Sequence, residues 1–279
     1  MCAVPAIGIL LTPQLSQRKD ELEYHLTEHL RLSGIYWGLT ALHLLGHPDA
    51  LDRDEVVEFV LSCQHDNGGF GAAPGHDAHL LYTVSAVQVL ALCEAMDILE
   101  ERGKGDRSPL PGSKGKESGT LAVGRYLASL QNRQTGTFAG DEWGEEDTRF
   151  LYAGVLALSL LKTLHLVDVD KAVDYIISCY NFDGGYGASP GAESHAMQIL
   201  VCVAALSILG RLDAVSDKEK LGRYLSERQL DGGGLNGRPE KLEDVCYSWW
   251  VAASLKIIGK LHWIDEKKLT RFILECQVS

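Results

Sequence analysis

Four polar residues that could act as acids, bases or ligands occupy the same place in four copies of a repeated pattern. Each lies nine residues after the aromatic residue or leucine that follows a turn: His79 follows Phe70, Asp147 follows Phe138, His195 follows Tyr186 and Asp244 follows Leu235. Each is expected at the start of a helix, so a ring of such helices would gather them at one rim, where helix dipoles favour an anion. Helix capping is the alternative, and it suits Asp147 better than the two histidines.

The fourth copy of the pattern carries the richest chemistry. Arg238 and Lys241 are two cations three residues apart, a spacing that could hold a diphosphate. Asp244 and Cys246 offer a carboxylate and a thiolate, which are ligand types that bind zinc, and Tyr247 follows directly. Two ligands are fewer than a zinc site needs, so a charged loop followed by a buried cysteine stays open as an alternative.

Amphipathic helices are predicted before the turns. Apolar residues recur there at i, i+3, i+4 and i+7, which indicates helices with one buried face. The stripes begin at Val56, Val123, Val173, Leu221 and Leu269. The last three begin 48 residues apart, and the pattern therefore predicts a repeat of about 48 residues. A further helix of this type is expected near Asp20.

A second type of helix, apolar nearly all round, is predicted in each repeat. These segments are 33–45, 80–93, 150–161, 196–209 and 247–258. Because they need cover on every side, we expect inner helices surrounded by the amphipathic outer ones, an all-α fold of the α/α toroid class. The count is six outer helices against five inner ones. Gln277 stands at the junction position of Gln64, so the ring is expected to be one inner helix short.

One stretch interrupts the repeat. Residues 101–119 are rich in Gly, Lys, Ser and Pro without apolar periodicity, which predicts a disordered insert. We therefore divide the chain into an N-terminal extension, residues 1–19, and one toroid domain, residues 20–279, that contains this insert.

Composition limits the classes of function. The chain has 26 Lys and Arg against 38 Asp and Glu, a net charge of −12, and no long basic run, which argues against nucleic-acid binding. The seven cysteines are scattered and lie mostly in apolar helical patterns, as in reduced cytoplasmic proteins. No uncharged stretch, 196–210 among them, reaches the roughly 20 residues that span a bilayer, so no membrane span is expected.

Seven segments resemble the β subunits of Rab geranylgeranyltransferases, the type II protein prenyltransferases. They are residues 32–39 (LSGIYWGL), 62–70 (SCQHDNGGF), 75–82 (GHDAHLLY), 138–150 (FAGDEWGEEDTRF), 181–186 (NFDGGY), 193–195 (ESH) and 233–250 (GGLNGRPEKLEDVCYSWW). The resemblance covers about residues 20–277 apart from the insert. It implies an enzyme that transfers geranylgeranyl from geranylgeranyl diphosphate to C-terminal cysteines of Rab GTPases. It also implies a heterodimer with an α subunit and a substrate presented by a Rab escort protein.

The resemblance assigns roles to individual residues. Asp244 and Cys246 would bind Zn²⁺, which would hold the acceptor cysteine as a thiolate, and Tyr247 would join them in the catalytic group. Geranylgeranyl diphosphate would be bound by His195, Ala196, Met197, Arg238, Lys241, Tyr247, Trp250, Arg149 and Ser33. Within that set Trp250 would line the lipid funnel, and Ser33 would leave depth for a twenty-carbon chain. Arg149 would add a contact at the rim.

The sequence departs from this family at one point. The third zinc ligand of the family is a histidine in a final repeat, which would follow Gln277. A shortened, inactive isoform that binds the α subunit is therefore an alternative to an active enzyme. Two other enzyme classes fit the pattern less well. Terpene cyclases share the toroid, but their Asp-x-Asp-Asp signature is absent, and a glycosidase would need paired carboxylates such as Asp147 and Asp244.

Overall fold

The computed structural model describes residues 22–102 and 118–277. The N-terminal extension and residues 103–117 of the insert lie outside these ranges. The chain divides into two compact units, which are described separately. The first contains the residues through Gln131 together with 139–145 and 156–167, and the second contains 132–138, 146–155 and everything from Asp168 onward.

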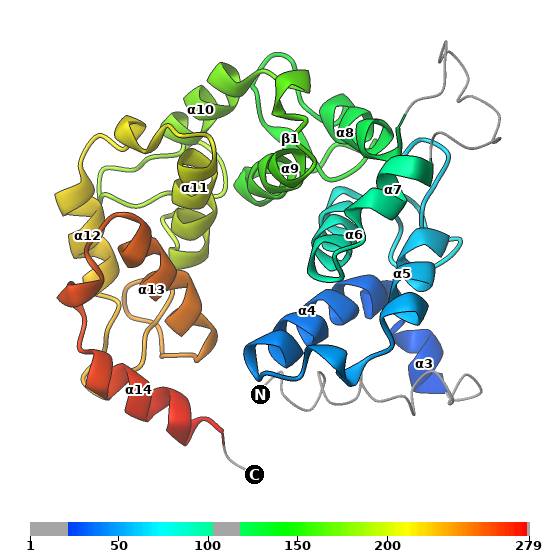
Figure 1. The fold of residues 1–279 in the computed structure, drawn as a ribbon. Helices are drawn as coiled ribbons and strands as arrows, with labels where there is room; N and C mark the ends of the chain where they lie inside the picture. The colour runs from blue at the N-terminus through cyan, green and yellow to red at the C-terminus, as the bar shows by residue number, and fades with distance from the viewer. Residues whose placement is uncertain (1–21, 103–117, 278–279) are drawn as a thin grey trace. The chain divides into compact units, whose positions relative to one another are not determined.

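The first unit is helical. Its elements in chain order are α3 (Leu22–Leu26), η1 (Glu28–Leu30), α4 (Arg31–Leu44), η2 (Pro48–Ala50), α5 (Arg53–Ser62), α6 (Leu80–Leu92), α7 (Met96–Arg102), α8 (Gly119–Ser129) and η3 (Leu164–Leu166). Figure 1 shows α4 and α6 side by side, with α5 also against α6. The boundary between the units falls within α9 (Thr148–Leu160).

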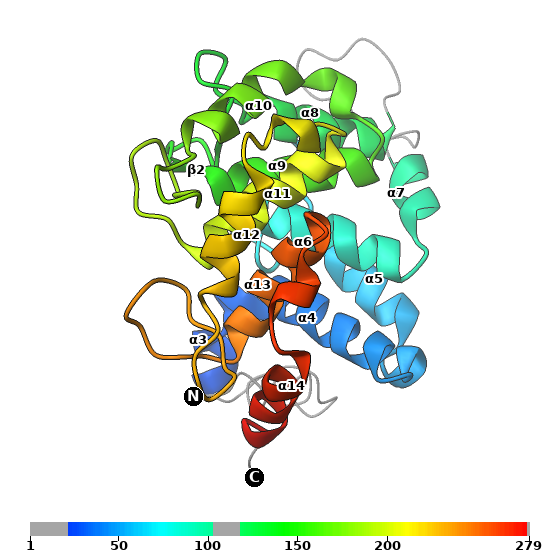
Figure 2. The same ribbon diagram turned by 90° about the vertical axis from the view of Figure 1, so that its left-hand side faces the viewer.

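The second unit repeats the same alternation. Its remaining elements are β1 (Phe138–Ala139, at the unit boundary), β2 (Glu146–Asp147), α10 (Val169–Ser178), α11 (Ala196–Ile208), η4 (Leu212–Ala214), α12 (Lys218–Ser226), α13 (Cys246–Ile257), η5 (Leu261–Trp263) and α14 (Glu266–Glu275). In Figure 2, α11 and α13 lie next to each other, and α12 packs on α13. Among the described residues, the only strands are the two-residue pair β1 and β2.

Local chemistry explains where the outer helices begin. Each has a polar cap whose side chain accepts a backbone N–H of the first turn; the caps are Asp52, Ser118, Asp168, Asp217 and Asp265. Such caps contribute about 1 kcal/mol each. The five inner helices α4, α6, α9, α11 and α13 start and end within about two residues of the ranges that their apolar pattern predicts. The apolar pattern is therefore sufficient to locate them.

Asp20, near which an outer helix is expected, lies outside the described residues; the described part of this region is α3, Leu22–Leu26, followed by a 3-10 turn. Two features differ from the sequence-based expectations. Part of the predicted insert is helical, because α7 extends to Arg102 and α8 begins at Gly119. Side chains of α11 are buried almost all round, whereas in α13 only Val251, Ser254 and Leu255 are buried and Trp249 is 67% exposed.

The repeats are joined by a recurring backbone hydrogen bond. Near the start of four inner helices, one N–H donates to a carbonyl in the loop of the following repeat. The pairs are Leu32 to Ala72, Leu80 to Gly140, Thr148 to Ala188 and Ala196 to Gly237, with N–O distances between 2.8 and 3.0 Å. These N–H groups have no partner within their own helix, so the neighbouring loop satisfies them.

Candidate functional site

A glycine turn positions each of the four repeated polar residues. In three turns an isolated β-bridge closes the loop, for example Tyr180 with Tyr186, and in the fourth the N–H of Ala139 donates to the carbonyl of Leu130 at 2.9 Å. Gly184 has a φ of +93°, a conformation that residues with a Cβ rarely adopt. The chain then runs to the start of the next inner helix, where all four residues lie as predicted.

Both histidines cap their helices, contrary to the expectation that they are poor caps. The Nδ1 atom of His79 accepts the N–H of Leu81, and that of His195 accepts the N–H of Met197, each at 3.1 Å. Burial lowers the pKa of both imidazoles. For His195 the nearby Arg238 lowers the pKa further. The cap therefore fixes each ring as a neutral imidazole near pH 7, with its proton on Nε2.

The proton on His195 determines what Tyr247 can do. His195 Nε2 lies 3.3 Å from the hydroxyl oxygen of Tyr247, and the two rings are 5.6 Å apart. Because Nδ1 already accepts a hydrogen bond, Nε2–H is the donor in this contact. The hydroxyl hydrogen of Tyr247 is then available for donation to an anionic ligand. Gly237 lies under this ring, since a Cβ there would be 2.4 Å from it.

Arg238 lies close to His195 and Tyr247, where an exposed ion pair holds it only weakly. Its guanidinium pairs with Glu193 from the preceding loop, and both side chains are partly exposed, at 37% and 64%. Exposed ion pairs contribute only about 0.2–1 kcal/mol, so a diphosphate could displace the carboxylate at little cost. Lys241 is exposed on the same loop. His195 before α11, Arg238 of this loop and Tyr247 of α13 thus meet in the second unit.

Two further residues predicted to contact the substrate have backbone roles. Ala196 is completely buried, and its N–H donates to Gly237 in the loop that carries Arg238. Met197 supplies the N–H that orients His195. These contacts help to fix the loop and the imidazole.

Asp244 and Cys246 lie together on the surface at the start of α13. Asp244 Oδ1 accepts the N–H of Cys246 at 2.9 Å, and this bond lowers the pKa of the carboxyl group. Burial, with the hydrogen bond to Asp244, raises the pKa of the Cys246 thiol to about 11, while contact with Trp250 acts in the opposite direction. The thiol is therefore protonated at neutral pH.

The donor set does not complete a zinc site. Among residues 22–102 and 118–277, no group of three or more His, Cys, Asp or Glu side chains is placed to hold a metal ion. Asp244 and Cys246 are two ligands, whereas a catalytic zinc site has three protein ligands and an open position. These two residues thus do not fit a zinc ion by themselves.

Zinc content tests this conclusion. We expect the 279-residue chain to retain well under one zinc ion per molecule after desalting, as measured by elemental analysis, because two ligands bind zinc weakly. Cys246→Ser should change that content little. A content near one zinc per chain, lost in Cys246→Ser, would contradict the expectation and show that a further ligand completes the site.

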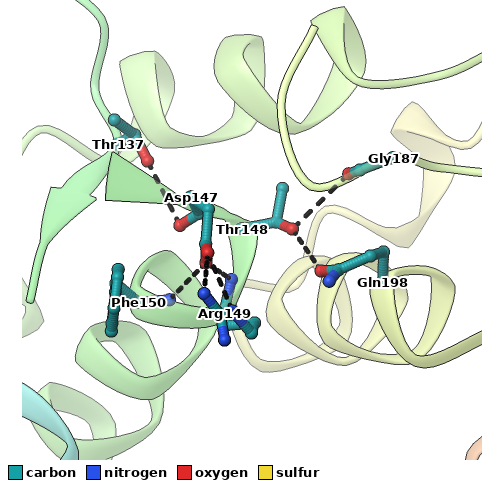
Figure 3. A network of polar contacts seen from close by, with 7 residues as sticks. All are labelled: Thr137, Asp147, Thr148, Arg149, Phe150, Gly187 and Gln198. Atoms are coloured by element: carbon teal, nitrogen blue, oxygen red, sulfur yellow. Dashed lines mark hydrogen bonds and ion pairs between the residues drawn. The ribbon is translucent and has the colours of Figure 1, made fainter. Parts of the chain in front are cut away.

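Asp147 and Arg149 form a separate network at the start of α9. Figure 3 shows the Asp147 carboxylate accepting hydrogen bonds from the backbone and side chain of Arg149 and from the N–H of Phe150. The adjacent Thr148 hydroxyl donates to Gln198 on α11 at 2.7 Å. Asp147 is therefore a helix cap, as the capping alternative predicts. The side chain predicted at the rim, Arg149, is tied to this carboxylate.

Of the remaining predicted residues, Trp250 lies half-buried on α13 in the second unit, and Ser33 and His79 lie in the first unit. Ser33 Oγ on α4 lies 3.5 Å from Ser85 Oγ on α6. His79 lines a cavity of about 690 Å³, together with Tyr126 and Asp141. The sequence did not predict this cavity. The sequence also did not predict that Arg228 is buried. The one sign of its burial is that the equivalent positions before the other three turns hold apolar residues.

Known proteins resemble this chain over most of its length. The family model for the prenyltransferase alpha-alpha toroid domain matches residues 14–279. The geranylgeranyl transferase type-2 subunit beta of Saccharomyces cerevisiae is 52% identical over 268 residues, which cover 94% of this chain and 77% of that protein. The chain belongs to the family of geranylgeranyl transferase type-2 β subunits. The corresponding β subunit 1 of Arabidopsis thaliana is 51% identical over 261 residues, which cover 94% of this chain and 75% of that protein.

A solved structure supports the same fold. The Candida albicans protein geranylgeranyltransferase-I complexed with GGPP aligns with a TM-score of 0.72 at 21% identity, covering 90% of this chain and 77% of that one. The toroid class and the resemblance to type II β subunits are thus confirmed, and the terpene cyclase and glycosidase alternatives are not supported. No helix in the described ranges of this type-2 β subunit is long and apolar enough to cross a bilayer.

Proposed function

We propose that this type-2 β subunit binds geranylgeranyl diphosphate and, with an α subunit in the cytoplasm, transfers the lipid to C-terminal cysteines of Rab GTPases presented by a Rab escort protein. The observation that carries the proposal is the meeting of His195, Arg238 and Tyr247 in one cluster. Two of the three offer hydrogen atoms to an anion, Arg238 once its ion pair opens and Tyr247 through its hydroxyl hydrogen. Helix starts beside them add further positive potential.

The reaction makes one demand that this cluster meets. The acceptor thiol releases its proton to water, its sulfur forms a bond to C1 of the lipid, and the C1–O bond breaks to release diphosphate. Negative charge then grows on the departing oxygens. Arg238, Lys241 and Tyr247 would neutralise that charge, and His195 orients Tyr247 through its Nε2–H. Preorganised donors of this kind typically lower a barrier by about 3–4 kcal/mol each.

A second candidate function is binding without turnover. It is favoured by one observation: Asp244 and Cys246 supply two zinc ligands and the described residues supply no third. In that case the chain would bind an α subunit and the lipid but would not transfer it.

A reconstituted transfer assay separates the two candidates. The chain is co-expressed with an α subunit, and labelled geranylgeranyl is followed into a Rab GTPase presented by its escort protein. Incorporation that depends on Arg238 supports the transferase. Stable binding of the α subunit and the lipid diphosphate, without incorporation, supports the second candidate. Failure to bind the diphosphate excludes both.

A further inference from the structure

A buried polar network lies beneath the candidate diphosphate site. It consists of the side chains of Arg228, Tyr224 and Asn236 and the backbone carbonyl of Ser194, and none of these four residues is more than 5% exposed. Among the described residues no carboxylate pairs with Arg228. Burying a charged group without an opposite charge is costly, so the network needs a reason other than hydrophobic packing.

Arg228 makes three contacts. Its Nε donates to the carbonyl oxygen of Tyr224 at 3.1 Å, which satisfies one of the last carbonyls of α12. The guanidinium carbon lies 4.8 Å from the centre of the Tyr224 ring. One terminal nitrogen donates to Asn236 Oδ1 at 3.4 Å. The guanidinium thus joins the end of α12 to the loop that follows it.

Two arms lead from Arg228 to the candidate site. The Asn236 amide donates to the carbonyl of Lys241 at 2.8 Å, which fixes the loop that bears both cations. The Tyr224 hydroxyl donates to the carbonyl of Ser194 at 2.9 Å, directly before His195. One buried cation therefore connects the two segments that carry the candidate diphosphate ligands.

The other repeats show that closing the turn does not require this network. The equivalent backbone bond runs from Asn236 N–H to Arg228 O at 3.0 Å, from Ala139 to Leu130 at 2.9 Å and from Gly187 to Cys179 at 3.1 Å. The same turn thus closes with an apolar side chain in place of the arginine and a small residue in place of the asparagine. The network is a special property of the repeat that carries Arg238 and Lys241.

We propose that Arg228 is a positioning residue for diphosphate recognition: through Asn236 and Tyr224 it holds the Arg238–Lys241 loop and His195 in fixed relation to each other. This inference rests on the proposed function. A donor displaced by about 1 Å can lose most of its effect on a ligand. Accurate placement of the diphosphate ligands can therefore offset the cost of burying the Arg228 guanidinium.

The double variant Arg228→Leu with Asn236→Ala tests the proposal. It reproduces the Leu130 and Ala139 pair of another repeat, so the chain should fold with an unfolding temperature close to that of the wild type. Its affinity for geranylgeranyl diphosphate should fall about ten-fold, while its affinity for the uncharged geranylgeraniol stays within about two-fold. Isothermal titration of both lipids measures the difference.

A pair of matched single variants keeps the test independent of that double variant. Tyr126 occupies in α8 the place that Tyr224 occupies in α12, and its buried hydroxyl has no hydrogen-bond partner within the described ranges. Tyr224→Phe removes only the bond to Ser194 and should weaken diphosphate binding several-fold. Tyr126→Phe removes a hydroxyl that makes no such bond and should leave diphosphate binding unchanged.

The outcomes separate this inference from the function on which it rests. If the wild type prefers the diphosphate to the alcohol and both the double variant and Tyr224→Phe keep that preference, the role of Arg228 is wrong and the proposed function stands. Equal losses for both lipids would show a merely structural role. A wild type without any preference would overturn the proposed function, and the role of Arg228 with it.

Discussion

Arg238→Ala should weaken binding of geranylgeranyl diphosphate by about ten- to a hundred-fold and leave binding of geranylgeraniol within about two-fold. A hydrogen bond to a charged group contributes about 1.5–3 kcal/mol, and each 1.4 kcal/mol is a factor of ten. Lys241→Ala should act in the same direction. Isothermal titration with each lipid, at two salt concentrations, measures the effect, which should shrink at high salt because the interaction is partly exposed.

Arg223→Ala is the matched control for charge. Arg223 is an exposed arginine of α12, so its removal changes the net charge by the same amount. It should leave both affinities unchanged. Glu193→Gln adds a second check, since it frees Arg238 from its ion pair and should strengthen diphosphate binding slightly. Equal losses for diphosphate and alcohol in Arg238→Ala would remove the role assigned to this guanidinium.

Gly136→Ala should lower the free energy of unfolding by roughly 2 to 5 kcal/mol. Gly136 has a φ of +84°, and an added Cβ would lie 2.3 Å from the backbone carbon of Lys171 on α10. A left-handed conformation costs a residue with a Cβ about 1–2 kcal/mol, and forced overpacking typically adds about 1–3 kcal/mol. Urea denaturation followed by circular dichroism measures the loss.

Gly144→Ala separates the two contributions. Gly144 has a similar φ of +89°, but no atom of the described residues lies within 4 Å of the place that its Cβ would take. This variant should therefore lose only about 1–2 kcal/mol. If Gly136→Ala lowers the free energy of unfolding no more than Gly144→Ala does, the prediction is wrong. That result would mean that α10 moves away from the added methyl group at no measurable cost.

The repeat made the inner helices and their polar starts predictable from sequence. Segments that are apolar on all sides marked the inner helices, although α13 buries only a few of its side chains, and a fixed distance from each turn located His195 and Asp244. The same logic missed α7. This helix has only 7 residues, about two turns, which is too short to show an apolar periodicity.

The sequence named His195, Arg238 and Tyr247 as members of one candidate site, but it could not show the contacts between them. Spacing along the chain cannot show that the neutral imidazole of His195 points its Nε2–H at Tyr247, because that depends on the cap made by Met197. It also could not find Arg228. A single arginine after an amphipathic stripe suggests an exposed side chain, and only packing shows that it is buried against Asn236.

The backbone bonds that join successive repeats all run in one direction along the chain. The N–H of Ala196 needs the carbonyl of Gly237, and the N–H of Leu80 needs that of Gly140, so each donor is synthesised before its acceptor. On the ribosome, the start of an inner helix therefore stays incompletely hydrogen-bonded until the loop of the following repeat has emerged. Damage to one loop should accordingly loosen the helix made before it as well as the helix that follows the loop.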